Sequence, residues 1–176
     1  MALSTGTKNI KTAIFISGKG SNLKSLIKFS KLKKSPIKIE IIISNNRKSK
    51  GLVFGKIYKI KNRVFDFNKQ SEAEKNILNI LKKKNINLIC LAGFMKILSK
   101  KFLITFRKKI VNIHPSLLPK FKGLDTHKKV LRNKEKYSGC TVHFVNSKLD
   151  SGRIISQKKV LIEKNETEIS LKKKIL

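Results

Sequence analysis

The sequence predicts an α/β protein with a Rossmann-like, mostly parallel twisted sheet and antiparallel strands late in the chain. Short apolar runs alternate with helix-like segments along most of the 176 residues, as expected for parallel strands connected by helices. Two later apolar runs, 139–145 and 155–162, have no helix between them and are expected to run in a different direction. A chain of this length is expected to form one domain with a sizeable core.

The first half of the chain is predicted to supply four strands. They are expected at Thr12–Ser17, Ile37–Ser44, Arg63–Phe67 and Leu88–Ala92. Helices are expected at 23–32 and 71–84, and residues 45–57 should form a turn and a short helix. The segment 71–84 has the clearest helical pattern, because its apolar residues recur at helical spacing and lysines fill its last turn.

The second half is predicted to continue with a helix, a strand and a helix before the two late strands. Their expected ranges are 98–108, 109–113 and 124–133. A last helix is expected from residue 166, and the sequence ends inside it. Residues 1–10 are expected to be a flexible extension, so residues 11–176 would form the single domain, with its C-terminal helix truncated.

The formal net charge of +32 raises the question of a nucleic-acid partner. Of the 42 basic residues 37 are Lys and only five are Arg, whereas phosphate and base recognition favours Arg. The lysines are spread along the whole chain, and Lys, Asn and Ile all have A/T-rich codons. We therefore expect a compositional origin and no specific nucleic-acid partner, with a general attraction for anionic ligands.

Other compositional features favour a cytoplasmic protein that binds small molecules. No segment approaches the ~20 apolar residues of a membrane helix, so no membrane partner is expected. Cys90 and Cys140 lie apart in apolar runs, which indicates free thiols in a reducing compartment. The spacing of His114, His127 and His143 matches no zinc motif, and no metal is expected.

The stretch Val111–Pro119 is the strongest candidate for a catalytic site. Apolar residues lead into it as a buried strand would, and Pro115 ends that strand. Residues i and i+2 of a strand point the same way, so Asn112 and His114 should project together. An amide beside an imidazole can hold a carbonyl oxygen and manage a proton.

The segment Ser17–Asn22 follows the first predicted strand and opens a helix. Its glycines allow close backbone approach, and free N–H groups at a helix start favour an anion such as phosphate. The pattern is neither a dinucleotide fingerprint nor a P-loop. The alternative is a plain turn in which Ser21 or Asn22 caps the helix.

Three further polar residues have structural as well as functional interpretations. Asp150 lies in the segment 149–152, which is typical of a turn; near His114, its carboxylate would orient the imidazole. His143 lies in an apolar strand and is interpreted as a core histidine. His127 is expected in the first turn of a helix.

Eight stretches taken together resemble a known family. They are 16–23, 43–45, 91–99, 111–119, 123–124, 126–127, 142–145 and 149–152. In this order they resemble phosphoribosylglycinamide formyltransferase, the folate-dependent enzyme of purine synthesis. The element His-Pro-Ser-Leu-Leu-Pro at 114–119 is shared with other formyltransferases, whereas 17–22 and Ala-Gly-Phe-Met at 92–95 point to the glycinamide enzyme.

The resemblance implies the formyltransferase fold and a specific reaction. The formyl group of 10-formyltetrahydrofolate, the co-substrate, would pass to the amine of N1-(5-phospho-D-ribosyl)glycinamide in de novo purine (IMP) biosynthesis. The implied catalytic residues are Asn112, His114 and Asp150. The implied phosphate-binding residues are Gly20, Ser21 and Asn22. The implied folate-binding residues are Met95, Lys96, Ile97, Leu98 and Asn112.

The implied mechanism needs neither a metal nor a covalent enzyme intermediate. The substrate amine attacks the formyl carbon, and Asn112 with protonated His114 stabilises the resulting oxyanion, a contribution of about 3 kcal/mol per donor. Asp150 keeps His114 charged and, through water, helps move the proton from the amine to the folate nitrogen.

Some positions depart from the family pattern. Gln70 lies near where an Arg assists folate binding, and Arg153 replaces a usual Pro after the Asp150 turn. The sequence also ends before the C-terminal helix in which the family supplies an acidic substrate contact. Two alternative functions are a methionyl-tRNA formyltransferase-like enzyme and an inactive relic that binds anions or RNA. No oligomeric state is predicted.

Overall fold

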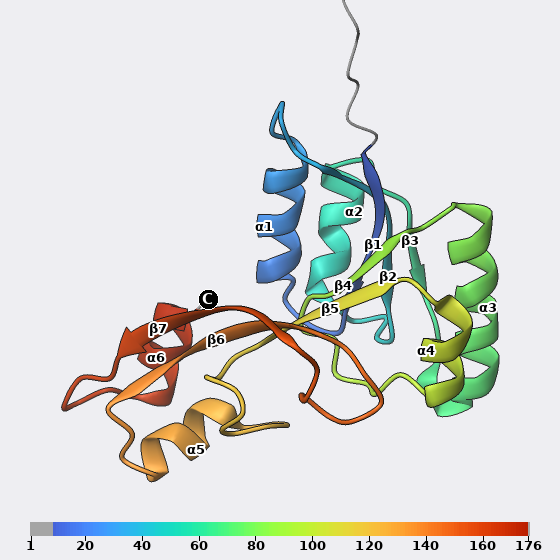
Figure 1. Cartoon of the computed structure of the whole chain (residues 1–176). Helices are drawn as coiled ribbons and strands as arrows, with labels where there is room; N and C mark the ends of the chain where they lie inside the picture. Colours follow the sequence, from blue (N-terminus) through green and yellow to red (C-terminus); the bar gives the residue numbers. More distant parts are fainter. Residues whose placement is uncertain (1–8, 176) are drawn as a thin grey trace, which may run out of the picture. The chain divides into compact units, whose positions relative to one another are not determined.

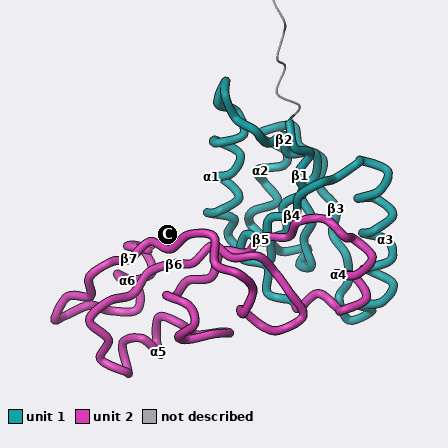
Figure 2. The backbone as a smooth tube through the Cα atoms, in the orientation of Figure 1, with its two compact units in different colours: residues 1–96 teal, residues 97–176 magenta. Residues whose placement is uncertain are grey.

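The computed structural model describes residues 9–175, which fall in two compact units, Met1–Lys96 and Ile97–Leu176 (Figure 2). Most of the extension predicted at 1–10 lies outside the described residues, and the first strand begins at Ile10. Each unit contains its own strands and helices, labelled in Figure 1.

The first unit is built on parallel strands, as predicted. They are β1 (Ile10–Ile16), β2 (Ile37–Ser44), β3 (Asn62–Val64) and β4 (Leu88–Leu91). β1 pairs with β2 on one side and β4 on the other, and β3 pairs with β2, so the order is β3-β2-β1-β4. Residues 13–16 of β1 are fully buried, because helices cover both faces of these strands, with α1 and α2 on one side and α3 on the other (Figure 1).

The helices of the first unit lie where the apolar periodicity predicts them. They are α1 (Ser21–Ser30), α2 (Val53–Ile57) and α3 (Gln70–Lys83), with 3₁₀ turns η1 (Lys50–Leu52) and η2 (Phe67–Lys69). The third strand is shorter than the predicted 63–67. Its chain turns at Asp66, whose carboxylate accepts the N–H of Asn68 at 2.9 Å and starts η2.

The second unit contains the antiparallel strands that the sequence predicts late in the chain. β5 (Lys109–His114), β6 (Tyr137–Phe144) and β7 (Ile154–Leu161) pair in the order β5-β6-β7, each antiparallel to its neighbour. The helices are α4 (Lys100–Phe106), α5 (Thr126–Arg132) and α6 (Glu168–Ile175). α4 starts two residues later than expected, because the Ser99 hydroxyl caps it by accepting the N–H of Phe102 at 3.0 Å.

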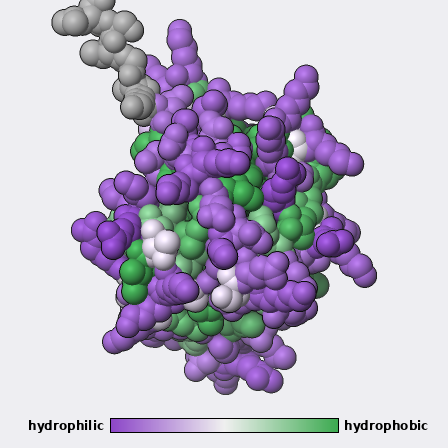
Figure 3. Space-filling view, turned by 90° about the vertical axis from the view of Figure 1, so that its right-hand side faces the viewer, coloured by the Kyte–Doolittle hydropathy of each residue, from purple (hydrophilic) through white to green (hydrophobic). Residues whose placement is uncertain are grey.

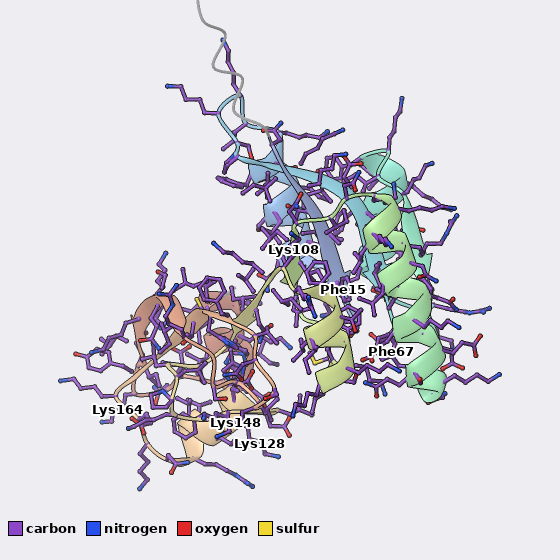
Figure 4. All side chains as sticks on the ribbon, turned by 45° about the vertical axis from the view of Figure 1, so that its right-hand side comes forward. Phe15, Phe67, Lys108, Lys128, Lys148 and Lys164 are labelled. Atoms are coloured by element: carbon purple, nitrogen blue, oxygen red, sulfur yellow. The ribbon has the colours of Figure 1, made fainter. Side chains whose placement is uncertain are left out.

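Lysines dominate the surface. The face in Figure 3 is mainly hydrophilic, with small hydrophobic areas between the charged side chains. Lysine side chains project from all parts of the ribbon, including the exposed and labelled Lys108, Lys128, Lys148 and Lys164 (Figure 4). No helix within residues 9–175 is long and apolar enough to cross a bilayer.

Candidate active site

The loop between β1 and α1 has the backbone of an anion-binding turn. Gly20 is the N-cap of α1 and has a φ of +79°, in the left-handed region. A Cβ at this position would lie 2.7 Å from the Cα of Gly51, so only glycine fits. The alternative, capping by Ser21 or Asn22, is wrong: no side chain caps α1, because the turn at Gly20 places both residues inside the first helical turn.

The first turn of α1 therefore presents polar groups that the helix itself does not use. Its leading N–H groups have no carbonyl one turn earlier to bond, and the first such bond of the helix joins Lys24 N–H to Gly20 O at 2.9 Å. Ser21 is exposed and Asn22 is half-buried, so a hydroxyl and an amide stand beside those N–H groups. This arrangement suits a phosphate.

A polar pocket of about 410 Å³ lies in the first unit, where the carboxyl ends of its strands meet. It is lined by Ser17, Asn45, Asn46, Asp66, Phe67, Asn68, Met95 and Lys96. Two of the predicted folate residues, Met95 and Lys96, are therefore exposed at its edge.

In the second unit, Asn112 and His114 project from β5 toward one carboxylate, as the strand alternation predicts. His114 is the last residue of β5 and is 4% exposed. Its Nδ1 lies 3.3 Å from Asp150 Oδ2 and its Nε2 lies 2.9 Å from the carbonyl oxygen of Phe121. Since both ring nitrogens face acceptors, a doubly protonated imidazolium can donate to both.

The sequence predicted that Asp150 would orient His114 if the two lay close together. The structure brings them together. Its side chain is 9% exposed and accepts the N–H of Gly123 at 2.9 Å and a longer bond from Asn112 Nδ2 at 3.5 Å. Burial is the largest influence on the Asp150 pKa and raises it. The contact with His143, the hydrogen bond from the Gly123 N–H and the charges of His114 and His143 outweigh burial, so the pKa is lowered.

His143 is a fourth member of this cluster that the sequence interpretation assigned to the core. It is 2% exposed, as a core histidine would be, but β5–β6 pairing places it directly opposite Asn112. Its Nε2 lies 3.2 Å from Asn112 Nδ2 and 3.6 Å from Asp150 Oδ1, and its Nδ1 lies 2.8 Å from Phe144 O. Burial lowers the His143 pKa, but Asp150 and the Phe144 carbonyl outweigh it, so the pKa is raised.

Two exposed apolar residues are sequence neighbours of the cluster and its partner Gly123. Leu149 precedes Asp150 and is 52% exposed, and Leu124, which follows the Gly123 bonded to Asp150, is 66% exposed. Of the other predicted folate residues, Ile97 is exposed, whereas Leu98 is buried and offers mainly its backbone.

The two residues at family-atypical positions both have partners. Gln70 Nε2 donates to Glu74 Oε1 at 2.9 Å within α3. Arg153 lies over the Phe144 ring at 5.2 Å, and its carbonyl accepts the Phe144 N–H at 3.0 Å. Arg153 therefore closes the turn that carries Asp150.

The sequence profile of the formyl transferase family matches residues 10–176. The chain belongs to this family. It is similar to the phosphoribosylglycinamide formyltransferase of Haemophilus influenzae, with 43% identity over 155 residues. That match covers 86% of this chain and 73% of that protein. It is also similar to the trifunctional purine biosynthetic protein adenosine-3 of Gallus gallus, with 40% identity over 172 residues. That match covers 96% of this chain but only 17% of the larger protein.

Solved structures of formyl transferases share the fold. The phosphoribosylglycinamide formyltransferase of Anaplasma phagocytophilum matches with a TM-score of 0.89 and 38% identity, over 96% of this chain and 79% of that one. The enzyme of the same name from Brucella melitensis matches with a TM-score of 0.90 and 36% identity, over 96% and 88% of the two chains.

Proposed function

We propose that this formyl transferase moves the formyl group of 10-formyltetrahydrofolate to the amine of N1-(5-phospho-D-ribosyl)glycinamide, a step of de novo purine (IMP) biosynthesis. The observation that carries the proposal is the convergence of Asn112, His114 and Asp150 in the second unit. The names of the relatives support the same reaction.

The cluster suits attack of an amine on a formyl carbon. The carbonyl oxygen becomes an oxyanion, and the Asn112 amide and the His114 imidazolium would stabilise it, each contributing about 3 kcal/mol. At His114 the oxyanion would replace the Phe121 carbonyl, which lies 2.9 Å from Nε2. Asp150 holds the charge of His114 through its contact at Nδ1. The attacking amine must lose a proton. The Asp150 carboxylate can accept it, through water, and pass it to the folate nitrogen, which leaves as its bond to the formyl carbon breaks.

The phosphate of the substrate is assigned to Gly20, Ser21 and Asn22 in the first unit. The left-handed turn at Gly20 and the free N–H groups after it form the receptor. The folate is assigned to Met95, Lys96, Ile97, Leu98 and Asn112, of which Met95 is 65% and Ile97 67% exposed.

We further infer that residues 10–176 act as one formyl transferase domain in the cytoplasm. The family match runs through both compact units. Cys90 and Cys140 are both free thiols, which supports a reducing compartment. Small molecules are the partners that this function requires.

The decisive experiment is an absorbance assay with 10-formyl folate and the ribonucleotide. We expect folate deformylation only when the ribonucleotide is present, and a loss of turnover by at least about 10³-fold in His114→Ala with folate binding retained. Near-normal turnover of His114→Ala would remove the proposed mechanism.

A matched pair of variants tests the phosphate loop, residues 17–22. Ser21→Glu places a carboxylate where the phosphate should bind, whereas Ser25→Glu adds the same charge one turn later on the exposed side of α1. We expect Ser21→Glu to raise the KM for the ribonucleotide about tenfold or more, and Ser25→Glu to leave it within about twofold. Equal effects would show that the loop has no special role.

A further inference from the structure

Ser17, the residue directly after β1, has every polar group engaged by the loops that follow β2 and β4. Its hydroxyl accepts the N–H of Met95 at 2.7 Å and donates to Asn45 Oδ1 at 2.5 Å. Its own N–H donates to Gly93 O at 3.1 Å, and its carbonyl accepts from Asn46 Nδ2 at 3.3 Å. Ser17 therefore connects the carboxyl ends of three neighbouring strands.

The Met95 segment, residues 93–96, has a second anchor at Phe94. Phe94 packs edge-on against Phe15 at 5.4 Å and Phe67 at 5.3 Å, two rings labelled in Figure 4. Met95 itself is 65% exposed, and Lys96 is exposed after it. The Phe94 ring thus holds the segment in the core, and the Ser17 hydroxyl sets where the exposed backbone beyond that ring lies.

The phosphate loop begins at the same serine but has its own anchors. The carbonyl of Gly18 accepts the Ser49 hydroxyl at 2.7 Å and the Gly51 N–H at 3.0 Å. These bonds do not involve the Ser17 hydroxyl. Removing that hydroxyl should therefore release the Met95 segment and leave the phosphate loop in place.

We propose that Ser17 is a positioning residue for the formyl donor: its hydroxyl holds the Met95 and Lys96 backbone in the place where the folate binds. This role rests on the proposed function. A hydroxyl that only stabilised the end of β1 would affect unfolding, not affinity. Because the Met95 N–H lies in an exposed segment, water can replace the bond that is lost with the Ser17 hydroxyl. Removing this hydroxyl should therefore change the position of the 95–96 backbone and leave the free energy of unfolding nearly unchanged.

The test compares Ser17→Ala with Ser17→Thr, which keeps the hydroxyl, and with Ser25→Ala, which removes an exposed hydroxyl from α1. For Ser17→Ala we expect the KM for 10-formyltetrahydrofolate to rise about 3- to 10-fold, with kcat and the ribonucleotide KM within about twofold of the parent. Ser17→Thr and Ser25→Ala should both keep the KM for 10-formyltetrahydrofolate close to that of the parent.

Two results would overturn the proposal. One is a donor KM for Ser17→Ala within about twofold of the parent. The other is an equal rise of both KM values together with a lower urea midpoint, which indicates general loosening.

A substrate-free measurement separates this proposal from the reaction itself. Amide hydrogen exchange at Met95 should be faster in Ser17→Ala by about tenfold. If the parent protein transfers no formyl group, tetrahydrofolate binding by calorimetry replaces KM: weaker binding by Ser17→Ala supports the positioning role without the reaction. Equal binding by both proteins, or binding by neither, refutes it.

Discussion

Replacing Asp150 with Asn removes the only carboxylate within reach of His114 and His143 among the described residues. The side chain keeps its size, and one oxygen remains to accept the Gly123 N–H, now 2.9 Å away. That oxygen also stays beside His114 Nδ1, so the new amide nitrogen faces the Asn112 amide, which is itself a donor, and His143. The charge and one acceptor are lost together.

The expected loss of stability follows from these distances. Only the Gly123 bond is short; the contacts to His114, Asn112 and His143 measure 3.3, 3.5 and 3.6 Å. A hydrogen bond to a charged group contributes about 1.5–3 kcal/mol, and the neutral amide keeps part of the Gly123 bond. We therefore expect Asp150→Asn to lower the free energy of unfolding by about 1–3 kcal/mol. Loss of the carboxylate that accepts the amine proton should lower kcat by about 10²- to 10⁴-fold.

The stability difference should also depend on pH, in a direction set by two pKa shifts. The Asp150 pKa is lowered in the folded protein, so its contribution is present above the unfolded pKa and is lost as pH falls through the folded pKa. The His143 pKa is raised, so its contribution is present below the unfolded pKa and is lost as pH rises through the folded pKa. The stability of the parent should therefore exceed that of Asp150→Asn most between the unfolded pKa values of the two groups, and the difference should shrink toward lower and higher pH.

Urea unfolding at about pH 3, 6 and 9 measures this difference, and the formyl-transfer assay measures kcat. Asp125→Asn is the matched control, because Asp125 is exposed, makes no capping bond and has a φ of 57° that Asn tolerates. The reasoning is refuted if Asp150→Asn keeps kcat within about tenfold of the parent, or if Asp125→Asn loses as much. A stability difference that does not change with pH would refute only the electrostatic contribution of Asp150 to the free energy of unfolding.

Three further predictions concern backbone space and a buried thiol. Gly20→Ala should raise the KM for the ribonucleotide about tenfold or more, since φ is +79°, whereas Gly18→Ala should not, since a Cβ there meets nothing within 4 Å; steady-state kinetics compares them. Gly152→Ala should lower the free energy of unfolding by about 1–3 kcal/mol and reduce kcat, because its Cβ would lie 1.8 Å from Phe144 O; an unchanged urea midpoint contradicts the packing of this turn. Burial raises the pKa of the Cys90 thiol to about 11, so Ellman's reagent at about pH 8 should label it only after unfolding, and rapid labelling of the native protein contradicts its burial.

Apolar periodicity predicted most of the fold, and its errors have local causes. The limits of β2 at Ile37–Ser44 were predicted without error, because its isoleucines first alternate with Lys38 and Glu40 and then continue as the buried run 41–43. The predicted third strand extends too far, since the carboxylate of Asp66 turns the chain. The helix predicted from residue 98 starts too early, since Ser99 caps it. Short-range hydrogen bonds of this kind carry no periodicity.

Residue spacing alone could predict the candidate site only where its residues are neighbours in sequence, and Asp150 was named by the family resemblance. Asn112 and His114 share one side of a strand, so two-residue alternation was sufficient to place them together. His143 enters the cluster only through the β5–β6 register, in which it lies opposite Asn112. No local pattern sets that register, and a shift by one residue would turn His143 to the other face. The chemistry of the cluster therefore depends on strand pairing as much as on the His-Pro-Ser-Leu-Leu-Pro motif. For that reason the motif alone could identify the family but not the fourth residue of the site.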